Sequence, residues 1–371
     1  MKWSLNLGQI AGIRLSVHWT FVILLVWVFI SYYRLQQNIE QGLMGVVLVL
    51  SLFVCIILHE LGHALTARRY NIQTKSITLL PIGGLAQLEK MPEKPNQELW
   101  VAIAGPMVNV VIAGVIYLML SLSGKLPDLS GHQEAVSFQD IGIWFQLFLA
   151  NVILVIFNLI PAFPMDGGRV LRALLAFRMD RAKATRIAAG VGQLLAIAFV
   201  FLGFYGNVWL IFIGVFIFLG AGAEADFETT KSALSTYTVK DVLMKKYTLL
   251  SPDDSLEKVV EILLDGQEQD FIIAEGDAVK GVLSRTELIK GLSEFGNKAP
   301  VSKVMKLNYI TLHPEMPLNE VFQNLMLKNC TVAPVIDNDK FIGIVDRENI
   351  YELLLVKEAL DAKEKKRLFR V

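Results

Sequence analysis

The sequence predicts a polytopic α-helical membrane protein with six transmembrane segments, followed by an α/β module. Three observations predict this class. Hydrophobic residues make up 54% of the 371 residues, and the mean hydropathy is +0.49, which is more apolar than an ordinary soluble chain. Long apolar runs dominate the sequence up to about residue 222, and a composition typical of soluble α/β domains follows. Two stretches of the C-terminal part also repeat one another.

The apolar runs predict six membrane spans. Each run is long enough, or nearly so, to cross about 30 Å of hydrocarbon at 1.5 Å per residue. The first run is longer than the apolar core of a signal peptide and lacks a clear cleavage site, so we expect it to be retained. The last span is short because Tyr205-Gly206-Asn207 predicts a tight reversal before it. The predicted spans are residues 16–33, 42–67, 98–122, 141–160, 184–205 and 207–222.

The distribution of basic residues predicts the orientation of these spans. Lysine and arginine are concentrated between the second and third spans and between the fourth and fifth, whereas the alternate loops contain only Arg34 and Lys125. The positive-inside rule therefore places the N- and C-termini in the cytoplasm. We expect a multi-pass integral protein of a prokaryotic cell membrane. The formal net charge of zero indicates no nucleic-acid partner.

The second span carries the motif His59-Glu60-Leu61-Gly62-His63. Two histidines four residues apart lie on one face of a helix, where both can bind one metal ion, and Glu60 lies close enough to act on water at that ion. Arg68, nine residues after His59, marks the end of the apolar run. At 1.5 Å per residue, the metal is expected roughly 8–14 Å below the cytoplasmic surface.

A hydrolytic zinc site needs a third protein ligand and an open position for water. That ligand comes either from His18 or from a carboxylate on another span. His18 lies next to Trp19 at the start of the first span, a position typical of an interfacial residue. Asp166 follows the fourth span and would cost about 2.5–3.5 kcal/mol at membrane depth without a partner. A cation held by two neutral histidines provides that partner, so Asp166 is the stronger candidate.

The segment around Asp166 has an irregular sequence. Pro161 and Pro164 break the helix, and Gly167-Gly168 are expected to allow a tight backbone turn. Non-helical backbone at membrane depth is tolerated where it is buried in protein or lines a wet cavity. Asn158, about two turns before Asp166, is a neutral donor that is expected to contact the substrate or a developing oxyanion.

Residues 75–89 are rich in β-forming side chains, with Gly83-Gly84 between two short runs. Two interpretations stay open. One is a strand edge that holds an unwound substrate in an extended form, and the other is a plain cytoplasmic hairpin.

Together, the His59–His63 motif, Gly105-Pro106-Met-Val-Asn109 and the segment from Asn158 to Gly167 resemble the site-2 protease family of intramembrane zinc metalloproteases over residues 1–222. Met165 stands where the family often has a different residue. Asn109 fits a helix–helix hydrogen bond at least as well as a catalytic role. The resemblance implies one zinc ion with His59, His63 and Asp166 as ligands, Glu60 as the catalytic base, and Asn158 as a contact to the substrate or transition state.

The C-terminal part contains a repeat with an offset of 62 residues, in which Gly281-Val-Leu-Ser-Arg285 matches Gly343-Ile-Val-Asp-Arg347. Repeated units of this kind stack to bury a shared face. The repeat resembles a tandem pair of cystathionine-β-synthase (CBS) domains, which in that family commonly bind adenine nucleotides in the cleft between repeats. We expect a linker at residues 223–236, the pair at 237–356 with repeats of about 237–294 and 299–356, and a charged tail at 357–371.

The nucleotide-binding pattern is incomplete in this sequence. The family often has Ser or Thr three residues after the glycine and Asp six residues after it. The first repeat has Ser284 and Glu287, and the second has Asp346 and Asn349. An acid at position 346 would repel a phosphate. Nucleotide binding and a structural or dimer-forming role therefore both stay open.

The predicted function is hydrolysis of a peptide bond in or near the transmembrane segment of a single-span membrane protein. In this family such cleavage belongs to regulated intramembrane proteolysis, and the CBS pair would modulate it. The alternative is a CBS-gated membrane cation transporter or channel, in which His59, Glu60 and Asp166 line a cation path. Such a path does not need a base beside the histidine pair.

Overall fold

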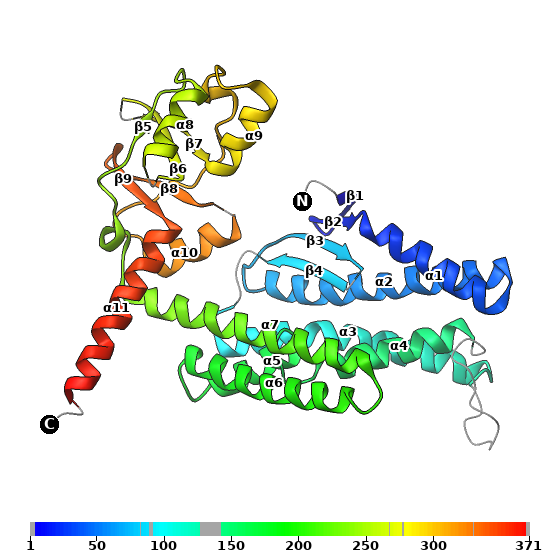
Figure 1. Ribbon diagram of the computed structural model, residues 1–371. Coiled ribbons are helices and arrows are strands. Elements are labelled where there is room, and N and C mark those ends of the chain that lie inside the picture. The colour runs from blue at the N-terminus through cyan, green and yellow to red at the C-terminus, as the bar shows by residue number, and fades with distance from the viewer. Residues whose placement is uncertain are drawn as a thin grey trace. The chain divides into compact units, whose positions relative to one another are not determined.

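The computed structural model describes residues 4–81, 83–88, 92–126, 142–266, 268–276, 278–328 and 330–368. The chain divides into two compact units, Met1–Asp226 and Phe227–Val371. The first unit consists mainly of long apolar helices with one small sheet (Figure 1). Its elements are β1 (Ser4–Ile10), β2 (Ile13–His18), α1 (Thr20–Gln36), α2 (Ile39–Arg68), β3 (Thr74–Leu80), β4 (Gly83–Leu88), α3 (Pro95–Leu122), α4 (Ile143–Asn158), α5 (Asp166–Ala176), α6 (Arg181–Gly203) and the start of α7 (Val208–Ala233).

The sheet has the strand order β1-β2-β3-β4. The two short runs expected in residues 75–89 form β3 and β4, which pair antiparallel, and both interpretations of this segment stay open. Strands β1 and β2 were not predicted, and the first span was expected to start at residue 16, inside β2. The signals were present: Ile13, Leu15 and Val17 alternate with more exposed residues, and Ala11 and Gly12 form a turn with φ of 53° and 83°.

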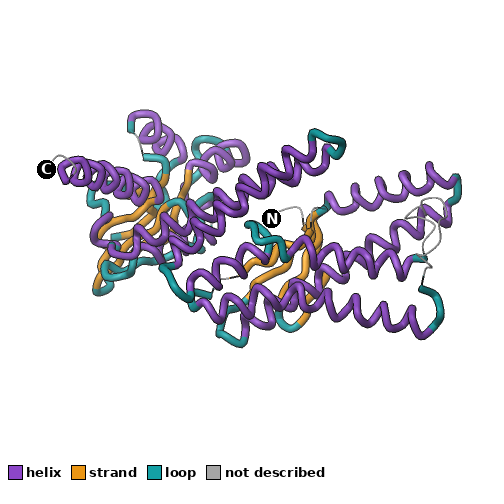
Figure 2. Tube along the Cα trace, turned by 90° about the horizontal axis from the view of Figure 1, so that it is seen from below, coloured by secondary structure: helices purple, strands orange, loops and turns teal. Residues whose placement is uncertain are grey.

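This sheet covers one side of α2, as both views show (Figure 1, Figure 2). Leu15 and Ile77 pack against Leu61 and Ala64 of α2. Leu61 lies inside the His-Glu-x-x-His motif. The sheet therefore buries the helix turn that carries the motif.

Within the described part of the chain, four helices are long and apolar enough to cross a membrane, namely α2, α3, α6 and α7. Two further apolar helices are shorter, Thr20–Leu35 within α1 and Ile143–Asn158, which is α4. The six-span arrangement remains a prediction. Helix α7 continues to Ala233, so most of the stretch expected to be a linker is helical. The segment around His132, which the predicted orientation places outside the cell, is not among the described residues.

The chain leaves the helical conformation after Asn158 and resumes it at Asp166, where α5 begins. We expected Gly167-Gly168 to form a turn, and this was wrong, because both lie in the first turn of α5. Their lack of a side chain has another use. A Cβ on Gly167 would lie 2.2 Å from the Ile160 carbonyl oxygen, and one on Gly168 would lie 2.6 Å from the Ala162 carbonyl carbon. The two glycines let the preceding loop fold closely over the start of α5.

The second unit contains the two predicted repeats, each with its own apolar core. Each repeat has a helix before its antiparallel strand pair, α8 in the first repeat and α10 in the second. The two sheets meet through Ile272, Val282, Val332 and Ile344, so the repeats bury a shared face. The elements are η1 (Leu234–Thr236), η2 (Val239–Val242), β5 (Leu249–Leu250), α8 (Leu256–Asp265), β6 (Asp270–Glu275), β7 (Ala278–Ser284), α9 (Arg285–Phe295), η3 (Val301–Lys303), α10 (Leu318–Leu327), β8 (Val332–Asp337), β9 (Lys340–Asp346) and α11 (Arg347–Leu368).

One carboxyl group in this unit has an unfavourable environment. Burial raises the pKa of Asp270, at the start of β6, and the nearby carboxylates of Asp346 and Glu287 raise it further. A hydrogen bond with Thr331 and the charge of Arg347 act in the opposite direction without cancelling the rise. The folded unit therefore disfavours the ionised form of Asp270.

We predict that Asp270→Asn raises the thermal midpoint of the CBS unit at neutral pH. The folded pKa of Asp270 is above its unfolded value of about 3.9, so the charge destabilises the fold above the folded pKa and has no effect below about pH 3.9. Thermal melts of the full-length protein should show a gain at about pH 7.5 that shrinks as the pH falls. Asp265→Asn, at an exposed position of α8, is the matched control. A midpoint that is unchanged or lower at neutral pH would contradict the prediction.

Candidate metal centre

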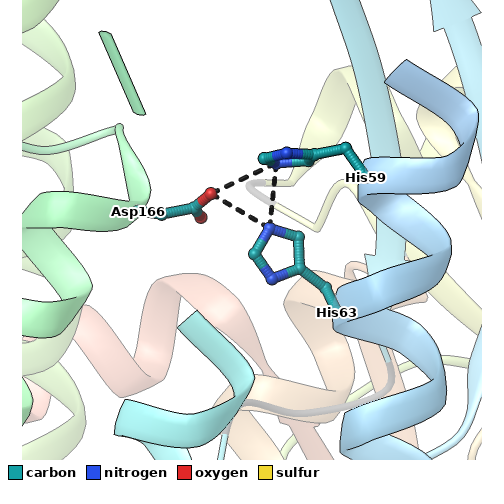
Figure 3. Close-up of side chains that lie close together, drawn as sticks. All are labelled: His59, His63 and Asp166. Atoms are coloured by element: carbon teal, nitrogen blue, oxygen red, sulfur yellow. Dashed lines mark hydrogen bonds and ion pairs between the residues drawn. The ribbon is translucent and has the colours of Figure 1, made fainter. Parts of the chain in front are cut away.

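His59, His63 and Asp166 lie together although α2 and α5 are far apart in the sequence (Figure 3). The two histidines project from adjacent turns of α2 toward the carboxylate at the first residue of α5. Nε2 of His63 lies 3.0 Å from Asp166 Oδ2 and 3.1 Å from Nε2 of His59. Nε2 of His59 lies 3.2 Å from the same carboxylate oxygen. All three side chains are buried.

The opposite nitrogens of both imidazole rings are held by α3. Nδ1 of His59 donates to Asn109 Oδ1 at 2.6 Å, and Nδ1 of His63 donates to the Val101 carbonyl oxygen at 2.7 Å. Because both partners are acceptors, the proton of each neutral ring resides on Nδ1. Each Nε2 then directs a lone pair toward Asp166.

Three electron-rich atoms consequently face one point from three sides. One proton can satisfy only one pair of them at a time, whereas a divalent cation can satisfy all three. Zinc bonds of about 2.0–2.1 Å in a tetrahedron put neighbouring ligand atoms about 3.3 Å apart. The observed separations of 3.0, 3.1 and 3.2 Å are close to that value. Two imidazoles and one carboxylate also match the donor set of hydrolytic zinc sites.

Gly105 of α3 provides the room at this point. A Cβ on Gly105 would lie 2.2 Å from Nε2 of His63 and 2.8 Å from Nε2 of His59. Any side chain at position 105 would therefore occupy the space in front of both imidazoles. Gly62 lets α2 and α3 approach one another, since its Cβ would lie 2.8 Å from the Ala104 carbonyl oxygen.

A chain of buried amides continues behind His59. Asn109 Nδ2 donates to Asn151 Oδ1 at 2.7 Å, and Asn151 Nδ2 donates to the Leu147 carbonyl oxygen at 2.8 Å. Both asparagines are fully buried, so every bond in this chain compensates a costly desolvation. The sequence offered a signal for Asn151, a lone polar residue in an apolar span, which our interpretation missed.

Glu60, a further predicted site residue, is not a member of the three-residue cluster. Glu60 is on α2 beside His59, and its side chain lies against the Gly84 backbone of β4, where a Cβ would come 2.9 Å from Glu60 Cγ. Asn158 ends α4, is partly buried, and donates from Nδ2 to the Leu154 carbonyl oxygen at 3.0 Å. His18, the alternative third ligand, instead has its Nδ1 2.8 Å from Thr20 Oγ1.

Arg169 is a further neighbour of the cluster that the sequence interpretation did not assign. Its guanidinium lies 3.6 Å from Asp166 Oδ1, one helix turn away. The two carboxylate oxygens of Asp166 therefore have different partners, since Oδ1 faces the Arg169 guanidinium and Oδ2 faces the imidazoles. These contacts favour the ionised form of the carboxyl group and fix its orientation.

Both parts of the chain are similar to known proteins. Residues 47–202 match peptidase family M50, and residues 239–294 and 301–356 each match the CBS domain. A zinc metalloprotease of Methanocaldococcus jannaschii is 30% identical over 359 residues, which cover 96% of this chain and 98% of that protein. A candidate zinc metalloprotease of Synechocystis sp. is 28% identical over 380 residues, covering 97% of each.

Among solved structures, a site-2 protease from M. jannaschii is 37% identical and covers 60% of this chain and 95% of its own, with a TM-score of 0.43. The full-length similarity to the archaeal metalloprotease extends through both the peptidase region and the CBS pair. The chain is therefore a member of peptidase family M50, the site-2 protease family of zinc metalloproteases, and carries a tandem CBS pair.

Proposed function

We propose that this protein is an intramembrane endopeptidase that cuts a peptide bond in or near a transmembrane segment of a single-span membrane protein. His59, His63 and Asp166 would hold one zinc ion per chain. The observation that carries the proposal is the convergence of their three donor atoms within 3.2 Å of one another. Both imidazoles have their other nitrogen occupied, which leaves the lone pairs that face Asp166 free for a cation.

Zinc at this position would lower the pKa of a water molecule to about 7 and polarise the scissile carbonyl. Glu60 would accept a proton from the attacking water molecule and return it to the leaving amine. Asn158 hydrogen-bonds the substrate or the developing oxyanion. Asn109 and the Val101 carbonyl keep both rings in the tautomer that the site needs.

The fold supports binding of an extended substrate. Strand β4 is at the end of the sheet order, so its outer edge is free for backbone pairing within the described part of the chain. Glu60 lies directly against this strand at Gly84. A substrate helix must be unwound before its amide bonds are accessible, and an added strand on β4 would present them beside the catalytic base.

The membrane arrangement we propose has six spans, with both termini in the cytoplasm. Its support is the four long apolar helices together with the two shorter ones and the basic loops of the sequence. In this arrangement the cleavage releases a cytosolic fragment, as in regulated intramembrane proteolysis.

We further propose that the CBS pair modulates cleavage, either through an adenine nucleotide or as the interface of a homodimer. The polar residues of the two repeats differ in their availability. Asn349 is engaged in the fold, since its Nδ2 donates to the Val242 carbonyl oxygen at 2.7 Å. Glu287 pairs with Lys306 at 2.7 Å and accepts a hydrogen bond from Ser284, so these polar side chains bond one another rather than the backbone. The first repeat is therefore the better candidate for a nucleotide.

The first test separates the base from the metal ligands. Glu60→Gln should keep zinc and the fold but lower cleavage roughly 10²- to 10⁴-fold, because the amide cannot accept the proton. The assay uses purified full-length protein and a tagged membrane protein captured on the Glu60→Gln form, with zinc measured by elemental analysis. Glu40→Gln, an exposed position of the same helix, is the matched control. Full activity of Glu60→Gln would remove Glu60 from the mechanism.

The ligand assignment has its own test. Asp166→Ala should lower the bound zinc, because two imidazoles alone hold the ion weakly. Elemental analysis of the purified variant measures this. Unchanged zinc content would reject Asp166 as a ligand.

A second metal-binding test uses the glycine in front of the imidazoles. Gly105→Ala should weaken zinc binding about tenfold or more, since overpacking of this kind costs about 1–3 kcal/mol. Competition with a chelator measures the affinity. Gly114→Ala on the same helix, where a Cβ meets no atom within 4 Å, should bind zinc as the unaltered protein does. Equal affinity of the two variants would contradict a metal position between the imidazoles.

The rival function, a CBS-gated cation transporter or channel, predicts a different outcome. Substrate cleavage by the purified protein that stops with a chelator supports the peptidase. Metal flux into liposomes without any cleavage would favour transport.

A further inference from the structure

We call residues 160–172, the segment that carries Asp166, the Asp166 arm. Helix α7 packs against this arm. Ala162 of the arm packs with Ile217 of α7, and Phe163 of the arm packs with Ala221. Gly220 of α7 lies against the arm so closely that a Cβ there would come 2.8 Å from Pro164 Cδ. Residues 217, 220 and 221 share one helix face, and that face meets the loop that directly precedes Asp166.

One turn further along the same face, a charged contact joins α7 to the end of the arm. The guanidinium of Arg172 forms an ion pair with Glu224 of α7. Arg172 also donates from Nε to Glu98 Oε1 of α3 at 2.7 Å, and Glu98 pairs with Arg181 of α6 at 2.7 Å. The network therefore links four helices, and Glu224 is the member contributed by α7.

The burial of this network makes it sensitive to the loss of one partner. Arg172 is 0% exposed and Glu98 is 2% exposed, whereas the Glu224 side chain is 33% exposed. A buried charge that loses its partner costs free energy. If Glu224 moves, Arg172 therefore either moves with it or loses this ion pair. The arginine also stacks on Phe163, with its guanidinium carbon 4.9 Å from the ring centroid. Movement of Arg172 is thereby coupled to the loop before Asp166.

Helix α7 crosses the boundary between the two units, so its last turns belong to the second unit. The helix runs without a break from Val208 to Ala233. The ring centroids of Phe227 and Phe322 lie 6.0 Å apart. Leu234, directly after the helix, is fully buried in the core of the second repeat. The stretch of α7 that meets the Asp166 arm, residues 217–224, lies entirely within the first unit.

We propose that α7 positions the Asp166 carboxylate against the two imidazoles, with Gly220 and Glu224 as positioning residues, so that a shift of α7 changes how firmly the metal is held. This inference rests on the proposed function, in which Asp166 is a zinc ligand. It identifies the face of α7 that touches the arm as the element that sets the position of Asp166.

The first test is a pair of alanine substitutions on α7 in the full-length protein loaded with Zn²⁺. Gly220→Ala pushes on Pro164, whereas a Cβ on Gly222 meets its nearest atom, Gln193 Nε2, at an ordinary 3.6 Å. We expect Gly220→Ala to release zinc to a chelator roughly 10- to 100-fold faster, the usual size of effects from residues that orient ligands. Gly222→Ala should release zinc at the rate of the unaltered protein.

The second test removes the charged contact. Glu224→Gln should accelerate zinc release over a similar range of roughly 10- to 100-fold. Asp226→Asn, an exposed position on the same helix, should not. Absorption spectra of the Co²⁺-loaded proteins report ligand geometry, so they should differ from the unaltered spectrum for Gly220→Ala and Glu224→Gln alone. A change that only destabilises the fold would lower the melting temperature and leave the spectrum of the folded protein unchanged.

The outcomes separate this inference from the proposed function. If the unaltered protein binds no zinc, the proposed function fails, and the inference fails with it. If the unaltered protein binds zinc but Gly220→Ala and Glu224→Gln release it at the unaltered rate, or no faster than their controls, the inference alone is overturned. If Glu224→Gln does not fold, the two glycine variants decide the question, since neither removes a charge.

Discussion

The constraint on which the rest of the first unit depends is the mutual repulsion of three lone-pair donors that face one another in a buried site. His59, His63 and Asp166 can converge this closely only if a cation, or at least a proton, lies among them. Helix α2 supplies the two imidazoles through its own periodicity. Helix α3 fixes their tautomers, and α5 brings the carboxylate. The arrangement is stable as a set, because removing any one of these helices would leave the other polar groups buried without partners.

Small residues make this convergence sterically possible. Gly62 brings α2 onto α3, Gly105 leaves room before the imidazoles, and Gly167 with Gly168 lets the broken segment fold over the start of α5. Each of these positions meets backbone or ring atoms that cannot move aside. The buried asparagines behind His59 have the complementary role, since they satisfy one another within apolar surroundings. Close approach and complete hydrogen bonding thus occur at the same helix crossings.

The same logic extends to the charged residues of α3, α5, α6 and α7. Isolated charges at such positions would be expensive, whereas the network of Glu98, Arg172, Arg181 and Glu224 is paired throughout. Because these residues come from four helices, the network specifies how the helices are arranged around the Asp166 arm. The α7 face meets the arm through both apolar and charged residues.

The sequence by itself determined the features that depend on local periodicity: the apolar helices, the His-Glu-x-x-His face, the β3–β4 hairpin and the CBS repeats. It also singled out Asp166, because an acid in an apolar region demands a partner. Only the tertiary structure decided which partners meet. The pairing of Asn109 with Asn151, the Arg172 network, and the use of Gly167-Gly168 for close packing rather than for a turn all join segments distant in the chain. A side chain's spacing along one helix follows from 3.6 residues per turn, whereas its partner on another helix depends on how all the helices pack.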